Sequence, residues 1–175
     1  INNMDRTTRW RYKKTISFIS KHLNPPQKIL DLGIKNQLSK YITAQGFEVV
    51  NTKGENLDDN FHAILDNNID VVTAFEIFEH MLAPFNILKN IKSNRLIASV
   101  PLKLWFAEAY WNESDDRDKH YHEFEIKQFN FLLKQTGWKI IDSETWIPKV
   151  QIKFGIRTLL RMITPRYYIV YCERI

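Results

Sequence analysis

The chain has 175 residues, of which 26% are charged and 44% hydrophobic, and its formal net charge is +5 at pH 7. This length suffices for one domain with a hydrophobic core, and the positive charge favours anionic partners such as nucleic acid, phosphorylated metabolites or a membrane surface. The single cysteine, Cys172, excludes an internal disulfide and a cysteine-based zinc cluster, and no apolar run reaches the ~20 residues of a membrane span, so we expect a cytoplasmic protein.

Residues 4–23 have the pattern of a basic amphipathic helix, which Asn24-Pro25-Pro26 would end. The apolar residues that would face the core are Trp10, Ile16, Ile19 and Leu23. The basic residues that would stay in solvent are Arg6, Arg9, Arg11, Lys13, Lys14 and Lys21. We expect this helix to cover the core, with a membrane-facing or RNA-facing role for its basic side as the alternative.

A strand–helix–strand unit follows. A short strand over residues 28–33 ends in Asp31 and Gly33, a helix follows over 34–45, and a second strand covers 47–50. The loop after the first strand has one glycine where a dinucleotide-binding loop would have three, because it reads Gly33-Ile-Lys-Asn-Gln-Leu. This argues against a tightly held pyrophosphate and leaves room for a nucleoside ligand without phosphates.

The stretch from Ile69 to Pro84 is the most informative part of the sequence. Residues 69–75 form a continuous apolar run with one acid near its start, which is typical of a strand buried on both faces. Glu76, Glu79 and His80 follow the run directly. Because ligands of open α/β sheets bind beyond the carboxyl ends of the strands, we expect a functional site here.

The rest of the chain predicts further helices and strands around one long connection. The expected elements are a helix over 84–91, a strand over 95–100, the connection 102–122, a helix over 125–136, and strands over 138–141 and 167–172. Residues 55–68 are too short for a strand–helix pair. The aromatic residues of the connection would form either the walls of a substrate site or a satellite core, and its mixed composition suits a lid. Residues 148–166 form a basic amphipathic linker.

Five segments together resemble class I S-adenosylmethionine-dependent methyltransferases of the type 11 and type 23 kind. They are Ile29-Leu-Asp-Leu-Gly33, Ile69–His80 with Pro84, Arg95–Pro101, His122-Glu-Phe and Gly137-Trp138. The resemblance, which covers roughly residues 25–145, implies a Rossmann-like α/β fold with a mostly parallel sheet and helices on both faces. We expect residues 1–175 to form a single domain. The last two strands are joined without a clear second crossover, so we expect one antiparallel strand. The sequence departs from the family because it lacks the second and third glycines of the first motif and the acid that ends the second strand.

The resemblance implies S-adenosyl-L-methionine as the cofactor, S-adenosyl-L-homocysteine as the product, and a small-molecule or lipid- or glycan-type acceptor. The cofactor-binding residues that it implies are Asp31, Leu32, Gly33, Asn51, Thr52, Asp58, Ala74, Phe75 and Glu76. The residues expected to act in catalysis are Glu79, His80 and His122, since an imidazole can take up the proton of the acceptor near neutral pH. The residues expected to bind the acceptor are Trp105, Tyr110, Trp111 and His120.

Three alternatives stay open. Glu76, Glu79, His80 and His122 also resemble the metal-binding pattern of small-RNA 3′-terminal 2′-O-methyltransferases, which would add a divalent metal ion and an RNA partner. The reduced glycine motif instead favours a degenerate, non-catalytic binding module. The basic and apolar stretch Phe154–Met162 indicates peripheral contact with a membrane that carries the acceptor.

Overall fold

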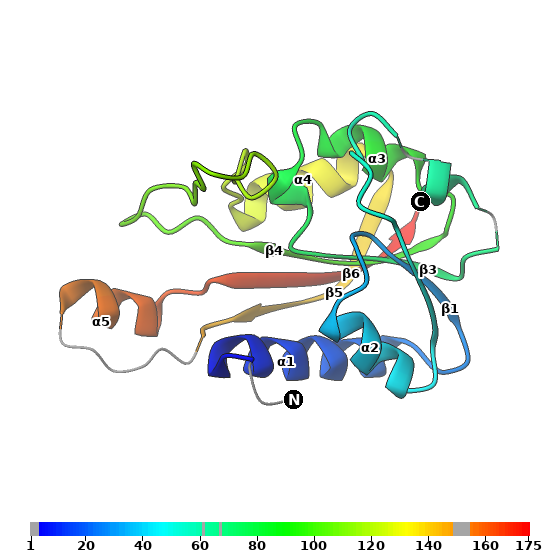
Figure 1. Cartoon of the computed structure of the whole chain (residues 1–175), viewed down its shortest axis with the longest axis horizontal. Coiled ribbons are helices and arrows are strands. Elements are labelled where there is room, and N and C mark those ends of the chain that lie inside the picture. Colours follow the sequence, from blue (N-terminus) through cyan, green and yellow to red (C-terminus); the bar gives the residue numbers. More distant parts are fainter. Residues whose placement is uncertain (1–3, 61, 67, 149–154) are drawn as a thin grey trace.

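The computed structural model describes residues 4–60, 62–66, 68–148 and 155–175, which form one six-stranded sheet with helices on both faces (Figure 1). The strand order is β2-β1-β3-β4-β6-β5. The strands are β1 (Lys28–Asp31), β2 (Glu48–Asn51), β3 (Val71–Phe75), β4 (Arg95–Pro101), β5 (Trp138–Trp146) and β6 (Tyr167–Arg174).

The sheet is mostly parallel, with β6 antiparallel to both of its neighbours, β4 and β5. This confirms the predicted Rossmann-like architecture with one antiparallel strand. Because the parallel strands all point the same way, the loops that follow β1, β3, β4 and β5 lie at one common edge of the sheet. This carboxyl edge is where open α/β sheets bind their ligands.

Five α-helices and two short 3₁₀ helices accompany the sheet within the described residues. They are α1 (Arg6–His22), α2 (Gln37–Ala44), η1 (His62–Leu65), η2 (Phe78–His80), α3 (Pro84–Asn90), α4 (Ile126–Gln135) and α5 (Ile156–Ile163). Asp5 begins α1, since its side chain accepts hydrogen bonds from the N–H groups of residues 7 and 8, and Asn36 caps α2 in the same way. In the described part of residues 55–68, η1 is the one regular element, as their shortness predicts.

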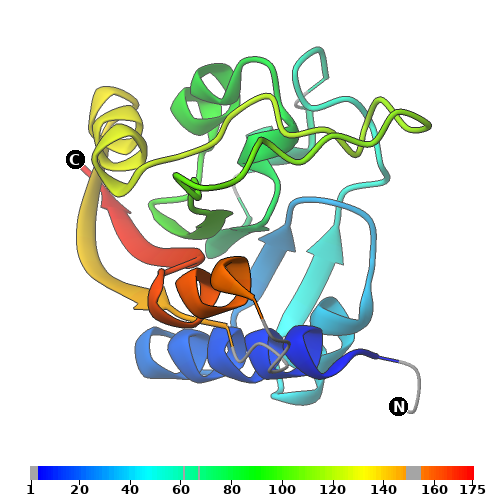
Figure 2. The ribbon, with the colours of Figure 1, turned by 90° about the vertical axis from the view of Figure 1, so that its left-hand side faces the viewer.

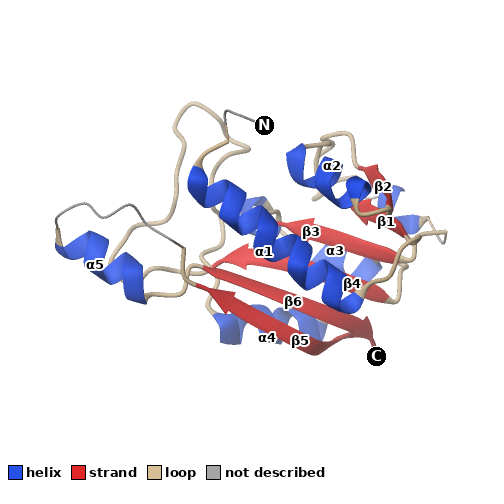
Figure 3. Ribbon diagram, turned by 90° about the horizontal axis from the view of Figure 1, so that it is seen from below, coloured by secondary structure: helices blue, strands red, loops and turns tan. Residues whose placement is uncertain are grey.

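Alternate residues of the strands build a separate core on each face of the sheet. Ile29 of β1 and Val71 of β3 pack toward α1 and α2, whereas Leu30 and Val72 pack toward α3 and α4. Figure 3 shows α1 and α2 in front of the sheet and α4 behind it. The continuous apolar run of β3 therefore reflects a strand covered on both faces, as predicted, and β1 is covered on both faces as well.

Strand β5 extends to Trp146, although the sequence predicts its end at residue 141. It lies at the edge of the sheet, pairs with β6 alone, and alternates between exposed and partly buried residues. Polar residues such as Asp142 and Glu144 occupy partly buried positions of this strand, so the sequence there has no apolar run that would indicate a strand.

Helix α5 projects from the end of the molecule that faces the viewer in Figure 2. It joins the end of β5 to the start of β6, so it lies at the carboxyl edge of the parallel strands. The predicted linker 148–166 falls partly outside the described residues, and Phe154 belongs to the part that is not described.

Candidate active site

Glu76 is held in a left-handed backbone conformation directly after β3, with a φ of 57°. Its N–H donates to the carbonyl of Ser99 in β4 at 3.0 Å, and the Ser99 hydroxyl donates to its carboxylate at 2.8 Å. Arg11 of α1 completes the arrangement, with Nη1 3.2 Å from Glu76 Oε2. Burial raises the pKa of Glu76, and the Arg11 guanidinium opposes this shift. The prediction that Arg11 stays in solvent is wrong, because α1 brings this side chain over the end of β3.

Two adjoining cavities lie at the carboxyl edge of the sheet. The first, of about 270 Å³, lies between α1 and the ends of β1 and β3. The second, of about 550 Å³, lies between the loop after β2 and the segment around η2. Gly33, Ile34 and Ile77 line both and form their common wall. These volumes are of the order found for small-molecule sites, about 300–1,000 Å³.

Most of the predicted cofactor residues line these cavities. The predicted residues around the first cavity are Asp31, Leu32, Gly33, Phe75 and Glu76. The predicted residues around the second cavity are Gly33, Thr52, Asp58 and His80. Sequence reasoning missed Arg11, Ile34 and Ile77, because nothing in their local pattern distinguishes them from solvent-facing residues.

Asp31 is buried and ties the ends of three neighbouring strands together. Its Oδ1 accepts a hydrogen bond from the Thr73 hydroxyl at 2.8 Å, and its Oδ2 accepts from the Ser39 hydroxyl at 2.9 Å and the Asn51 amide at 3.0 Å. Burial raises the pKa of Asp31, and these three hydrogen bonds oppose the shift. The Asn51 amide nitrogen is thus directed at Asp31, and Asn51 is not among the residues that line the two cavities, so its contact with the ribose stays a prediction.

Other predicted cofactor residues shape the walls of the cavities. The buried Thr52 hydroxyl accepts a hydrogen bond from the N–H of Gly33 at 2.7 Å, which fixes the turn after β1. The carboxylate of Asp58 accepts hydrogen bonds of 2.8 and 2.7 Å from the N–H groups of residues 82–83. Ala74 is fully buried and lines neither cavity, and its contact with the cofactor stays a prediction.

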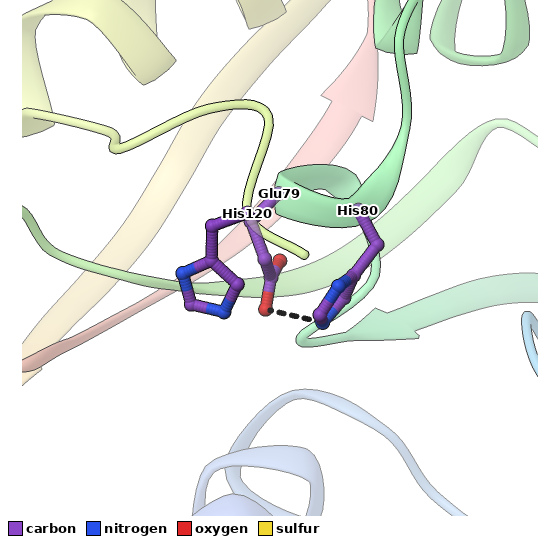
Figure 4. A group of neighbouring side chains, drawn as sticks. All are labelled: Glu79, His80 and His120. Carbon is purple, nitrogen blue, oxygen red and sulfur yellow. Dashed lines mark ion pairs between the residues drawn. The ribbon is translucent and has the colours of Figure 1, made fainter. Parts of the chain in front are cut away.

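Glu79, His80 and His120 gather beside the second cavity, which His80 lines (Figure 4). One nitrogen or carboxylate oxygen from each residue lies within 4.8 Å of those of the other two. Glu79 is 1% exposed, its Oε1 lies 3.7 Å from His80 Nε2, and its Oε2 has no hydrogen-bond partner in the part of the chain that the structure describes. Burial, and then the Glu76 carboxylate, raises the pKa of Glu79 well above its usual range.

Both imidazoles of this cluster are oriented through Nδ1. His80 Nδ1 lies 3.0 Å from the carbonyl oxygen of Lys119, and His120 Nδ1 lies 2.9 Å from Glu123 Oε1. A carbonyl oxygen can only accept a hydrogen bond, so Nδ1 of His80 carries the proton. In the neutral ring Nε2 is then unprotonated and can accept a proton or bind an ion. Burial also lowers the pKa of His80, which favours this neutral form.

His122, predicted to act beside Glu79 and His80, does not join this cluster. Its Nε2 lies 3.3 Å from the carbonyl oxygen of Leu82, and its ring stacks on Phe124 with the centroids 5.5 Å apart. The N–H groups of His122 and of the residue before it both donate to the carbonyl of Glu79. The four-residue metal pattern predicted from the sequence is therefore not assembled, and a histidine two positions earlier takes the place of His122.

The aromatic residues predicted to bind the acceptor are not among the residues that line the cavities. Trp105, Tyr110 and Trp111 are 74%, 47% and 50% exposed and line neither cavity. His120, also predicted to bind the acceptor, instead belongs to the cluster with Glu79. Other residues of the connection 102–122 line the second cavity, namely Asp116, Arg117 and Tyr121.

Comparisons with protein-family models and with curated proteins gave no match to this sequence. Solved structures share its fold. The 1,6-didemethyltoxoflavin-N1-methyltransferase of Burkholderia thailandensis, solved with 1,6-didemethyltoxoflavin and S-adenosylhomocysteine, is 16% identical with a TM-score of 0.65, over 93% of this chain and 77% of that one. The magnesium protoporphyrin IX methyltransferase of Synechocystis PCC 6803, solved with S-adenosylhomocysteine, is 13% identical with a TM-score of 0.63, over 97% and 84%.

The same fold also occurs in a protein described by a different reaction. The cyclase SpnF is 11% identical to this chain with a TM-score of 0.63, over 92% of this chain and 80% of that one. At these identities the likeness shows the fold alone, which is that of class I S-adenosylmethionine-dependent methyltransferases. The chemistry of this chain has to be argued from its own residues.

Proposed function

We propose that this chain is an S-adenosylmethionine-dependent methyltransferase that acts on a small-molecule or lipid-type acceptor. The observation that carries the proposal is the pair of cavities at the carboxyl edge of the sheet, joined along Gly33, Ile34 and Ile77. Two adjoining compartments suit the two halves of an elongated ligand, a nucleoside and an amino acid. The absence of a three-glycine loop is no obstacle, because this ligand has no pyrophosphate to bind.

The charges in the first cavity suit the amino-acid half of the cofactor. Arg11 and Glu76 carry opposite charges and line the same cavity, as a ligand with one carboxylate and one ammonium group requires. Arg11 is also the one cationic side chain among the described residues around this cavity. We assign the methionine carboxylate to Arg11 and the methionine ammonium to Glu76.

The second cavity suits the nucleoside half. Apolar side chains of Leu57 and Met81 line it together with the carboxylate of Glu55. Apolar walls with a few polar groups are typical of sites for ring-shaped ligands. Glu55 is four residues beyond the end of β2 and lines the second cavity, and we assign a ribose contact to it.

The cluster beside the second cavity would prepare the acceptor. When bound, S-adenosylmethionine supplies a sulfonium methyl group, which an acceptor oxygen or nitrogen attacks in line as the carbon–sulfur bond breaks. Holding the reacting groups aligned supplies several kcal/mol of the barrier reduction. The acceptor must also lose a proton, and the free Nε2 of His80 is a suitably basic group that lines the cavity.

The exposed helix α5 bears on the kind of acceptor. Ile156, Leu159 and Ile163 fall on one side of it and are 79%, 61% and 65% exposed. Arg157 and Arg161 fall on another side, and neither forms an ion pair with a described residue. An apolar stripe flanked by arginines suits a helix that lies in the surface of an anionic membrane. We propose that α5 brings the cavities to a lipid-borne acceptor.

Within the described residues, no helix combines the length and the apolar character that crossing a membrane requires. The proposed contact is therefore peripheral, through one side of α5. Its position at the carboxyl edge of the sheet puts it at the same edge as the cavities.

The proposal is tested by turnover. The purified protein is incubated with S-adenosylmethionine and with fractions of membrane lipids or small metabolites, and the release of S-adenosylhomocysteine is measured. We expect release that depends on one fraction and that falls strongly in the Arg11→Met variant. Binding of S-adenosylhomocysteine without turnover in any fraction would favour a non-catalytic member of this fold instead.

A further inference from the structure

We infer that Glu79, His80 and His120 form a binding site for a divalent transition-metal ion such as Zn²⁺. The three side chains come from two segments, η2 and the connection 102–122, and converge on one point (Figure 4). Two imidazoles and one carboxylate are ligands that Zn²⁺ and its neighbours in the first transition row accept, whereas Mg²⁺ and Ca²⁺ prefer oxygen ligands alone.

The two imidazoles are fixed in the way that metal-binding histidines are fixed. The Lys119 carbonyl and the Glu123 carboxylate each lie within hydrogen-bond distance of an Nδ1, at 3.0 and 2.9 Å. Such outer partners set the tautomer and the ring orientation of a ligand histidine. In this arrangement Nε2 of both rings is left to bind an ion.

The third candidate ligand, Glu79, is a buried carboxylate with one oxygen that lacks a hydrogen-bond partner in the described residues. Glu79 is 1% exposed, and its Oε2 has no hydrogen-bond partner among the residues that the structure describes. Buried carboxylate oxygens are normally paired, and an unpartnered one indicates a missing ion or other ligand. A cation between Glu79 and the two rings would balance the charge of this buried carboxylate, whose Oε1 lies 3.7 Å from His80 Nε2.

The geometry permits a catalytic type of site. The three candidate ligand atoms lie within 4.8 Å of one another, and bonds of about 2.0–2.2 Å to Zn²⁺ would draw them closer together. Three protein ligands leave a fourth position open, as in catalytic zinc sites. His80 also lines the second cavity, so the open position is accessible from that side.

A role for the ion in the reaction rests on the proposed function. A hydroxyl of the acceptor in the open position would lose its proton to solvent more readily, because the cation lowers the hydroxyl pKa. His80 would then act as a ligand rather than as a base. The metal site itself does not depend on this role and is tested without the reaction.

The experiment measures ion binding to the full chain after removal of metals with a chelator. Titration calorimetry with Zn²⁺ is expected to give one tight site per chain. Glu123→Gln retains all three ligands and is expected to weaken the affinity for Zn²⁺ by about 10–100-fold. His120→Gln removes a ligand and is expected to weaken the affinity at least as much. The matched control is His122→Gln, which removes an imidazole two residues away and is expected to bind as the wild type does.

The inference is overturned if the wild type has no stoichiometric site, or if His120→Gln and His122→Gln bind Zn²⁺ equally well. Circular dichroism shows whether each variant is folded. S-adenosylhomocysteine binding by the metal-free wild type tests the proposed function separately. A wild type that binds S-adenosylhomocysteine but not Zn²⁺ would refute the metal site alone. A wild type that binds Zn²⁺ but not S-adenosylhomocysteine would refute the proposed function alone.

Discussion

Arg11 in α1 and Glu76 after β3 are 65 residues apart in the chain and form an ion pair of 3.2 Å at the wall of the first cavity. The Ser99 hydroxyl holds the other carboxylate oxygen of Glu76, so the pair is fixed from two sides. This relationship makes the N-terminal helix part of the candidate site rather than only a cover for the sheet.

The first prediction concerns Arg11. Arg11→Met should weaken S-adenosylhomocysteine binding by about 10–100-fold, since a hydrogen bond to a charged group contributes about 1.5–3 kcal/mol. The free energy of unfolding should change by less than about 1 kcal/mol, because the ion pair is partly exposed. Titration calorimetry measures the first quantity and urea unfolding the second. The control is Lys14→Met on an exposed position of α1, and equal affinities of the two variants would contradict the assignment.

The second prediction concerns Gly33 between the two cavities. Its φ is 107°, and a Cβ there would lie 3.2 Å from Cδ1 of Ile77. Gly33→Ala should therefore lower the free energy of unfolding by about 1–2 kcal/mol and weaken S-adenosylhomocysteine binding. Gly46→Ala is the matched control, since its φ is 96° and its Cβ would lie 3.3 Å from Pro25 outside the cavities. A similar loss of affinity in both variants would show that the effect is not local.

The third prediction concerns the buried hydrogen bond from Thr73 to Asp31. Thr73→Val keeps the shape of the side chain and removes the donor, so the free energy of unfolding at pH 7 should fall by about 1–3 kcal/mol. Thr73→Ser keeps the hydroxyl and serves as the control. Urea unfolding of both variants gives the two values, and a smaller loss for Val than for Ser would contradict the prediction.

This loss should depend on pH with a defined sign. Burial raises the pKa of Asp31 above its unfolded value of about 4, so the folded state binds this proton more tightly and stability from this group falls as pH rises above 4. Removing the Thr73 donor raises that pKa further. The gap in unfolding free energy between Thr73→Val and the wild type should therefore widen from pH 4 to pH 7, and a constant or shrinking gap would refute this account.

The fourth prediction concerns α5 and anionic lipid. The wild type should sediment with vesicles that contain phosphatidylserine at low salt and should not sediment with neutral vesicles. Leu159→Glu, on the apolar side, should abolish sedimentation, because it removes apolar area and adds a negative charge. Thr158→Glu makes the same charge change on the opposite side and should retain more binding. Equal losses would indicate a purely electrostatic effect and contradict insertion of the apolar side.

Local sequence patterns predicted most of the sheet, except for the second half of β5, and part of the candidate site. The apolar run of β3 followed by Glu76, Glu79 and His80 predicted a buried strand with ionisable side chains at its end, and the structure has this arrangement. The function of these side chains stays a prediction. The sequence also predicted one antiparallel strand, because the last two strands are joined without a clear crossover, and this strand is β6. These features depend on residues that are near one another in the chain.

Side-chain positions that depend on tertiary packing could not be predicted from local sequence patterns. His120 and His122 have the same local surroundings, and the choice between them depends on how the connection 102–122 meets η2 through hydrogen bonds to the carbonyl of Glu79. Arg11 has the pattern of a solvent-facing residue and is directed by the path of α1 across the sheet. Asn51 ends β2 where a ribose-binding acid is common, yet its amide is held by Asp31.

The most direct test of the account is thermal unfolding of the metal-free protein with and without S-adenosylhomocysteine. A ligand at ~100 times its Kd adds about 2.7 kcal/mol to the free energy of unfolding, which corresponds to a rise in Tm of several degrees for a chain of this length. We predict such a rise for the wild type and a much smaller one for Arg11→Met. An unchanged Tm at millimolar S-adenosylhomocysteine would contradict the account, because the cavities at the carboxyl edge would then not bind this cofactor.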